Sequence, residues 1–478
     1  MKNLINIVGI IWVWFLGAAF SFAQPSITLE AILEKVSAES YPVELAKNKV
    51  EITQAQLNLL KAELRPSLGL DLLLPNFKKS STQVIQPDGA ISFQNISQNN
   101  SSASLYINQH IGKTGGLLFV QSDLQRFDDF TGESRQYNGS PFRIGLIQPI
   151  FGFNQWKWKK KLLPFVFKEA SLNYNFALEN AQWQATNLFF DVLISQVNKE
   201  IALTNKTVNE NLLKITKERY KLGKASMDQQ LQLEMEYKNA MLDEHLSEQS
   251  FGRAVTELYT FLNAHEIPQH ITCEVPNAPK DLILDAEVLV QRALQNHPPL
   301  LAYERMLIEQ DKNRAQLKAQ YGIKANLFLG FGFSKAAENI ETIYQQPFDE
   351  QQLKLSVSVP IIDWGQKKQA LKIATLERKE IEQNIRQEHL VLENKIRNKV
   401  QQFLLLKNDL ELLKDIKKIA EERFEISRQR YTLGNISITD LTLAQREKDQ
   451  ASRAFILTLR DYWSLYYELR TLVAGDLP

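Results

Sequence analysis

Two short stretches of the sequence resemble a phosphate-binding loop and a metal-binding site. In HIGKTGG, Gly112 to Thr114 match the end of a phosphate-binding loop, but Ile107 stands where that motif requires its first glycine. In HEIPQHITC, Pro268 breaks any common helix face for the four side chains of metal-ligand type, His265, Glu266, His270 and Cys273. No nucleophile elbow appears elsewhere. The sequence therefore predicts no catalytic residue, metal or cofactor, and hence no enzyme.

The overall charge argues against a nucleic-acid partner. Lys plus Arg total 56 against 55 acidic residues, which leaves a net charge of +1 rather than a basic footprint. A chain of 478 residues with 44% hydrophobic content can form at least two packed units.

The first 23 residues have the composition of a signal peptide. Lys2 precedes an apolar run from Leu4 to Phe20, and the small residues Ser21 and Ala23 predict cleavage before Gln24. The remainder has no apolar stretch near 18 residues, so no transmembrane helix is expected. The single cysteine, Cys273, predicts neither a disulfide framework nor a lipid anchor. Any membrane attachment must therefore come from strands.

The sequence repeats itself. RYKLGKASMDQQLQLE begins at Arg219 and RYTLGNISITDLTLAQ at Arg430, 211 residues later, and Pro149 and Pro360 have the same spacing. Upstream pairs are 256 residues apart, namely Pro42 with Pro298 and Pro66 with Gly322. The two offsets agree if the first half carries 45 extra residues between Pro66 and Pro149. We interpret the chain as a tandem duplication with one enlarged region.

Each half contains a very long predicted helix. Gln366 to Leu433 holds neither Gly nor Pro, and such a helix spans about 100 Å. The corresponding run in the first half goes from Phe165 to Leu222, after Pro164. In the second half apolar residues follow steps of three and four, as in a coiled coil: Leu392, Ile396, Val400, Phe403, Leu406, Leu410, Leu413, Ile416, Ala420 and Phe424.

The stretches before these helices alternate between apolar and polar residues, which is typical of strands with one apolar face. Clear alternation occurs at 68–74, 142–146, 327–333 and 353–359, giving four strands, or six if residues 101–110 and 115–124 form a further pair. Strands of this kind fit a membrane barrel, and they also fit a soluble sheet with one buried face.

Aromatic residues gather where strand becomes helix, and they favour the membrane interpretation. Trp156 and Trp158 follow Pro149, and Trp364 follows Pro360, as at a bilayer interface. Polar segments at the opposite ends of the strands resemble external loops. Asn154 and Asp363 are predicted N-caps of the helices that follow.

With these features together, the chain resembles the TolC family of outer-membrane efflux proteins over nearly its whole length. The resemblance rests on the duplicated strand–Pro–helix junctions, the RYxLG turns and the ending QREKDQASRAFILTLRDYWSLYYEL. It implies a mixed α and membrane-β fold, a trimeric 12-stranded outer-membrane β-barrel continued into a periplasmic α-helical coiled-coil barrel. The implied segments are a signal peptide (1–23), a first repeat (24–262), an equatorial linker (263–283) and a second repeat (284–478).

Oligomerisation also follows from the strands themselves. Four or six strands fall short of the eight that a closed barrel needs, and open edges are not tolerated in lipid. Several chains must therefore share one barrel. In the family this number is three.

The resemblance assigns a role to the repeated turns. Gly223 and Gly434 supply the backbone freedom for a reversal, and in the family such turns form the periplasmic tip, which meets an adaptor protein and closes the entrance. The residues involved here are Arg219, Tyr220, Gly223, Arg430, Tyr431 and Gly434.

Asp440 stands where the family places an acidic residue of the entrance constriction. In the first half Gln229 occupies the equivalent position, with Asp228 beside it. Leu443 and Ile436 depart from the family pattern of a second acidic residue and a basic residue. The alternative interpretation is that Asp440 caps the helix that begins there.

The expected function is a passive exit duct of the Gram-negative outer membrane. It would work with an adaptor and an inner-membrane transporter, in an efflux pump or in type I secretion. Drugs, metal ions and proteins remain open as cargo. The alternative is a soluble periplasmic coiled-coil adaptor or structural protein, which would have no need for two sets of alternating strands.

Overall fold

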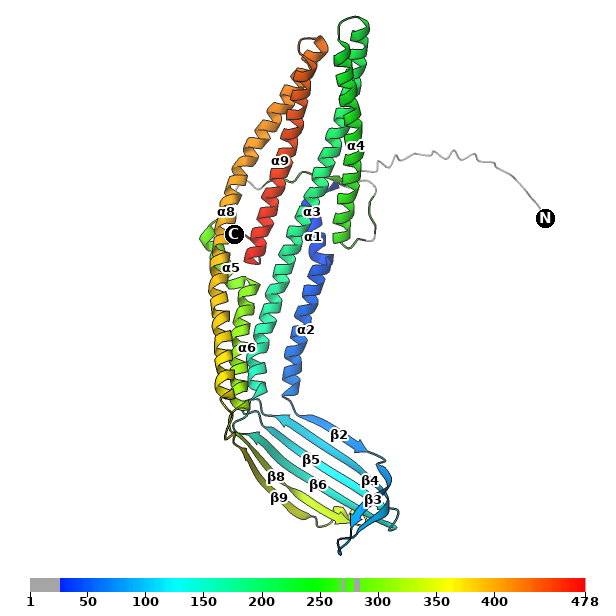
Figure 1. Ribbon diagram of the computed structural model, residues 1–478, viewed down its shortest axis with the longest axis vertical. Helices are drawn as coiled ribbons and strands as arrows, with labels where there is room; N and C mark the ends of the chain where they lie inside the picture. Colours follow the sequence, from blue (N-terminus) through cyan, green and yellow to red (C-terminus); the bar gives the residue numbers. More distant parts are fainter. Residues whose placement is uncertain (1–25, 265, 269–270, 279–283, 478) are drawn as a thin grey trace, which may run out of the picture. The chain divides into compact units, whose positions relative to one another are not determined.

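The computed structural model describes residues 26–264, 266–268, 271–278 and 284–477 (Figure 1). The predicted signal peptide, residues 1–23, and two of the considered metal ligands, His265 and His270, lie outside this part of the chain, as does part of the predicted linker. The described residues form two compact units, each assembled from three separate segments. We call them the sheet unit (residues 42–181, 284–404 and 465–477) and the hairpin unit (26–41, 182–278 and 405–464).

The sheet unit contains a seven-stranded antiparallel sheet (Figure 1). Its members are β2 (Ser67–Leu73), β3 (Phe77–Ile85), β4 (Ile91–His110), β5 (Leu117–Asp129), β6 (Ser134–Pro149), β8 (Lys324–Ala337) and β9 (Phe348–Ser358). The pairing order is β2-β4-β5-β6-β8-β9. β3 also pairs with β4, beyond the part of β4 that pairs with β2, so β2 and β3 together form one edge of the sheet.

The sheet corrects the strand count. Four strands per chain is too small a number, because residues 101–110 lie in β4 and residues 117–124 of the second stretch lie in β5, and these strands pair with each other from Gln98 to His110. Six strand positions therefore lie side by side, the higher of the two expected counts. A total of twelve, which assumes four strands from each of three chains, does not follow from this sheet.

The predicted alternation sets the two faces of the sheet. Leu68, Ile107, Val120, Ile144 and Phe331 are register neighbours on five successive strands. The adjacent row of the opposite face reads Gly69, Tyr106, Gln121, Arg143, Gly332 and Glu350. Since successive side chains on a strand point to opposite faces, one face is apolar and the other is largely polar or glycine.

Helical segments complete the sheet unit. These are α2 (Tyr41–Glu63), α5 (Ala286–Asn296), α6 (Pro298–Gln320), the short α7 (Ile340–Ile343) and parts of α3, α8 and α9. Leu289, Val290 and Ala293 of α5 are buried. Two ion pairs tie helices of this unit together, Arg470 to Glu179 at 2.7 Å and Arg305 to Glu169 at 2.5 Å.

The hairpin unit contains the remaining parts of α3, α8 and α9 together with α4, which form two helical hairpins. A short pair of strands and one short helix complete it. α3 (Gln155–Lys221) is followed by α4 (Met227–Phe261), and α8 (Gln366–Leu433) by α9 (Ile438–Val473). β1 (Ser26–Ile27) pairs in parallel with β7 (Thr272–Cys273), and α1 (Leu29–Glu39) follows β1 directly in the sequence.

The predicted range is correct for α8, whereas the predicted start is wrong for α3. α8 covers the range expected from the absence of Gly and Pro, and Leu392, Ile396, Val400, Phe403, Leu410 and Phe424 of its predicted seam are buried. α3 begins ten residues before Phe165, so Pro164 lies inside the helix rather than before it. The reason is the N-cap: the Asn154 side chain accepts the backbone N–H of Lys157 at 3.1 Å and sets the start of the helix.

Candidate functional site

The two RYxLG segments lie at the ends of α3 and α8, where each helix turns back into the next one (Figure 1). Both turns have the same backbone hydrogen-bond motif. In the first turn Lys224 N–H donates to the Arg219 carbonyl at 2.8 Å and Gly223 N–H to the Tyr220 carbonyl at 2.9 Å. In the second turn Asn435 and Gly434 donate to the equivalent carbonyls, both at 2.9 Å. The glycines have φ of +71° and +85°. This is a Schellman motif, which needs the left-handed conformation at its C′ residue.

The helices that follow the turns also begin alike. Ser226 and Gln229 form a capping box at the start of α4, in which each side chain accepts the other residue's backbone N–H at 3.2 Å. Ser437 and Asp440 form the same box at the start of α9. The repeat therefore extends beyond RYxLG, and Gln229 and Asp440 occupy one structural position.

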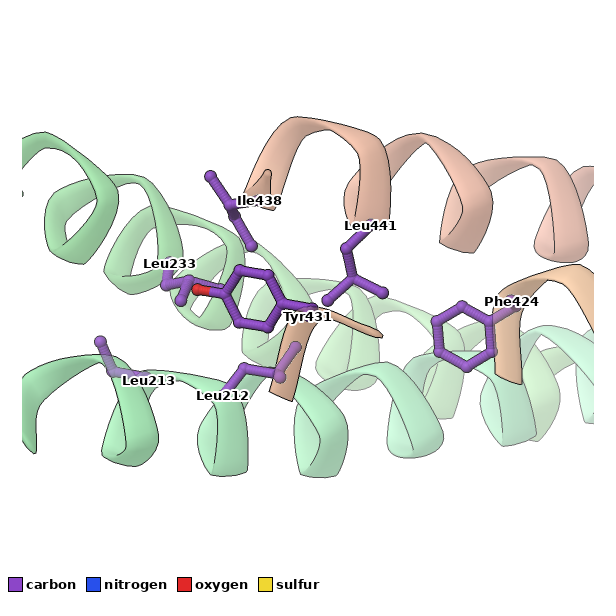
Figure 2. Close-up of a cluster of buried hydrophobic side chains, with 7 residues drawn as sticks. All are labelled: Leu212, Leu213, Leu233, Phe424, Tyr431, Ile438 and Leu441. Carbon is purple, nitrogen blue, oxygen red and sulfur yellow. The ribbon is translucent and has the colours of Figure 1, made fainter. Parts of the chain in front are cut away.

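The turns differ in what covers them. Tyr431 is 4% exposed, whereas Tyr220, its equivalent, is 43% exposed. Figure 2 shows the Tyr431 ring among apolar side chains from α3, α4, α8 and α9, and the buried cluster consists of Leu212, Leu213, Leu233, Phe424, Tyr431, Ile438 and Leu441. The second turn is thus packed into the hairpin unit and the tyrosine of the first is half exposed.

Two polar contacts hold Tyr431. Its hydroxyl is 2.9 Å from the Thr216 hydroxyl in a buried hydrogen bond. Its carbonyl accepts from the Arg219 guanidinium at 3.3 Å, and the same guanidinium lies 5.9 Å from the centre of the ring. Arg219 of the first motif therefore contacts Tyr431 of the second and links the two hairpins. Sequence analysis missed Thr216, which carries no motif signal.

Gly434 is constrained and Gly223 is open. A Cβ at Gly434 would lie 2.8 Å from Nη2 of Arg219, whereas a Cβ at Gly223 would have no atom within 4 Å. Both positions favour glycine for their φ, but only at Gly434 would an added Cβ also displace a neighbouring side chain, the Arg219 guanidinium.

The other predicted residues of the turns lie at the surface. Arg430 is exposed, as are Asp228 and Asp440 in the first turns of α4 and α9. Hydrogen bonds from the Ser437 hydroxyl and backbone N–H lower the pKa of Asp440 below its ordinary value. The carboxylate therefore performs the capping role that was the alternative to the constriction.

The strand–helix junctions of the sheet unit contain the predicted aromatic residues, with one correction. Pro149 ends β6, and Pro360 follows β9 by two residues. Trp364 is 91% exposed, but Trp156 is only 6% exposed because it packs against His110, with ring centres 4.6 Å apart. Trp156 therefore cannot contact lipid headgroups. Trp158 is partly buried.

The hairpin unit also contains an open groove. It has a volume of about 800 Å³ and is lined mainly by polar side chains, among them Asn205, Glu236, Asp243, Arg446 and Asp449. Asn205 and Asp449 already hydrogen-bond each other at 2.6 Å. Within the described ranges no group of three or more His, Cys, Asp or Glu could hold a metal ion. No described helix is both long enough and apolar enough to cross a membrane.

Comparison with known protein families gives a match, which covers part of the second half of the chain. Residues 289–475 match the family model described as "Outer membrane efflux protein". No curated protein sequence matches the chain.

Several solved outer-membrane proteins share the fold. The Campylobacter jejuni CmeC outer membrane channel has 13% identity and a TM-score of 0.68, with coverage of 100% of this chain and 94% of that one. Vibrio cholerae VceC has 13% identity, a TM-score of 0.64 and coverage of 94% and 97%. The Neisseria gonorrhoeae MtrE outer membrane channel has 14% identity, a TM-score of 0.57 and coverage of 94% and 89%. At these identities the likeness shows a common fold.

Proposed function

Because residues 289–475 match the outer membrane efflux protein family and the whole chain shares the fold of solved outer-membrane channels, we propose that it is the exit duct of a tripartite pump or a type I secretion system. Such a duct is an efflux channel of the outer membrane rather than an enzyme. It conducts cargo passively, and an inner-membrane transporter supplies the energy through a periplasmic adaptor.

The exposed apolar face of the sheet carries this proposal. Leu68 and Leu70 on β2 and Leu353 and Leu355 on β9 are each more than half exposed. Water-exposed apolar area of this extent on a soluble protein marks an interaction surface, and alternating strands with an apolar outer face are the mark of an outer-membrane barrel. A soluble coiled-coil adaptor would have no reason to expose this face.

A homotrimer follows as the second part of the proposal. Five residues of α8 recur every seven positions and are between 58% and 75% exposed: Leu405, Leu412, Ile419, Ile426 and Leu433. α4 carries a second exposed apolar stripe, Leu231, Met235, Leu242 and Leu246. Seven-residue spacing is the pattern of a coiled-coil seam that packs against another helix. We assign these stripes to contacts between copies, three in number as in the TolC family.

We assign the two turns to the end of the duct that meets the adaptor. Gly434→Val and Gly223→Val should leave assembly intact and weaken export, because a β-branched residue resists positive φ. Crosslinking in cells from Lys224 and Asn435, replaced by a photoreactive residue, should capture the adaptor. Capture at neither position, with normal protein levels, would refute this assignment.

The entrance proposal concerns Asp440, with Asp228 as its acidic neighbour in the first repeat. The capping box uses Oδ2 of Asp440, which leaves the exposed carboxylate able to face a pore. Three carboxylates around a narrow mouth attract cations. Purified assemblies in planar bilayers should be cation-selective and blocked by multivalent cations, and Asp440→Asn should weaken both effects. Equal selectivity and block in both proteins would leave Asp440 with the capping role alone.

The test of the function itself is extraction from membranes. The protein should be recovered only with detergent, as a heat-sensitive oligomer of three copies, and deletion of its gene should reduce export. Recovery as a freely soluble monomer would disprove the proposal.

A further inference from the structure

We propose that three copies of this chain close an eighteen-stranded barrel, in which β4 and β5 form an additional hairpin of the membrane wall. The inference rests on the proposed homotrimer and goes beyond it, because the resemblance implied only twelve strands. Its basis is the pairing of the sheet and the position of the 45 extra residues in the first half.

The additional hairpin can be identified from the internal repeat. Pro66 and Gly322 are equivalent, and they lie just before β2 and β8. Pro149 and Pro360 are equivalent, and they lie at or just after the ends of β6 and β9. β2 therefore corresponds to β8 and β6 to β9, while β4 and β5 have no counterpart in the second half. These two strands occupy the enlarged region.

The pairing places β4 and β5 in the wall rather than in a loop. β4 pairs with β2 over seven residues and then with β3 over nine. β4 and β5 pair without a break from Gln98–Asp129 to His110–Leu117, and β5 pairs with β6 on its other side. Transmembrane strands need about 9–11 residues, and β4 and β5 have 20 and 13. Both strands are thus long enough to span the bilayer and have partners on both sides.

The apolar face continues across the additional hairpin. Ile107 of β4 and Val120 of β5 stand between Leu68 of β2 and Ile144 of β6 in one register row. Leu105 stands opposite Leu70 and is 47% exposed. The hairpin therefore presents apolar side chains on the same face as the strands common to both halves, as a lipid-facing wall requires.

The opposite face is built to line a lumen. Ser104 of β4 donates to Asp123 of β5, and Gln121 Nε2 donates to the same carboxylate at 2.7 Å. Farther along the sheet Arg143 of β6 reaches Glu350 of β9 at 2.8 Å across β8. Gly332 lies between them in the register row, and a Cβ there would be 2.9 Å from Cα of Arg143. Polar links of this kind suit the inward face of a barrel.

The edges of the sheet determine how copies join. β2 with β3 forms one edge and β9 the other. Six antiparallel positions make the two edge strands run in opposite directions, so β9 of one copy can pair with β2 and β3 of the next in an all-antiparallel ring. Backbone groups at an edge in lipid must find such a partner. Three copies then give eighteen strands, and since barrel diameter grows linearly with strand number, the barrel is about 1.5 times as wide as one of twelve.

Site-specific fluorescence tests the wall directly. Leu105→Cys on β4, Leu353→Cys on β9 and Ser104→Cys on the opposite face of β4 would each be labelled with a fluorophore and reconstituted with brominated lipids. The wild-type protein is the control for background, because Cys273 is buried. Bromine quenches only nearby fluorophores, so labels at Leu105 and Leu353 should be quenched to the same degree and the label at Ser104 much less.

The possible results separate the inference from the proposed function. Quenching at Leu353 without quenching at Leu105 would place the hairpin outside the wall and overturn the inference, while the membrane barrel would stand. No quenching at either position would overturn the membrane barrel itself. Counting subunits by stepwise photobleaching should give three, and electron cryomicroscopy of the same sample should resolve eighteen strands. Any other strand number would also refute the proposal.

Discussion

Replacement of the two turn glycines by alanine should affect the two turns unequally. Both substitutions place a Cβ at positive φ, which costs about 1–2 kcal/mol. At Gly434 the new Cβ also meets Arg219 at 2.8 Å. The guanidinium must then shift, which disturbs its contacts with the Tyr431 carbonyl and ring. We take these contacts as worth about 1–2 kcal/mol, because Arg219 is only partly buried. Gly434→Ala should therefore cost about 2–4 kcal/mol locally and Gly223→Ala about half as much.

Hydrogen exchange at the turn amides measures this cost, since local opening exposes the Lys224 and Asn435 N–H groups that close the two motifs. Exchange at Asn435 should accelerate roughly 30- to 1,000-fold in Gly434→Ala. In Gly223→Ala, exchange at Lys224 should accelerate roughly 5- to 30-fold.

The Arg219→Ala background supplies the control. Without the guanidinium, Gly434→Ala should cost no more than Gly223→Ala does in the wild-type background, because only the φ term remains. Equal effects of the two glycine substitutions in wild-type protein, or no coupling between Gly434→Ala and Arg219→Ala, would refute the steric argument.

Three further predictions concern single side chains. Tyr431→Phe leaves the buried Thr216 hydroxyl without its partner and should cost about 1–3 kcal/mol, whereas Tyr220→Phe in the exposed equivalent should change stability by less than about 0.5 kcal/mol; equal effects in urea unfolding would contradict this. Asp440→Ala removes the capping box and should lower the amide protection factors in the first turn of α9; unchanged protection in Asp440→Ala would exclude the cap. Acidification should lower the same protection factors, taken relative to the intrinsic exchange rate at each pH, because the lowered pKa of Asp440 means that its stabilisation is full above the ordinary value of 3.8 and is lost as pH falls through the folded value. Burial lowers the pKa of His297 from 6.5 to about 4, so stability should be full above pH 6.5 and fall by up to about 3 kcal/mol as pH drops toward 4; His297→Asn should flatten this dependence, and an unchanged slope would assign it to other groups.

Features set by local sequence could be predicted without the structure. The extent of α8 followed from a run without Gly or Pro, and the two turns from the repeated RYxLG, because helix continuity and left-handed backbone depend on a few neighbouring residues. Four of the strands, β2, β6, β8 and β9, followed from period-two alternation in the same way, whereas β3 was not predicted and β4 and β5 were expected only as an alternative pair. The family resemblance then supplied the fold that the comparisons support.

Features set by distant contacts required the tertiary structure. Tyr220 and Tyr431 stand in the same five-residue motif, yet one is exposed and the other is buried against Thr216, which lies 215 residues away in sequence. The same holds for Trp156, which His110 covers, and for the place of β4 and β5 in one sheet with strands of both halves. A repeat copies backbone propensity but not surroundings, because burial and strand pairing depend on which other segments pack nearby, and no local pattern encodes that.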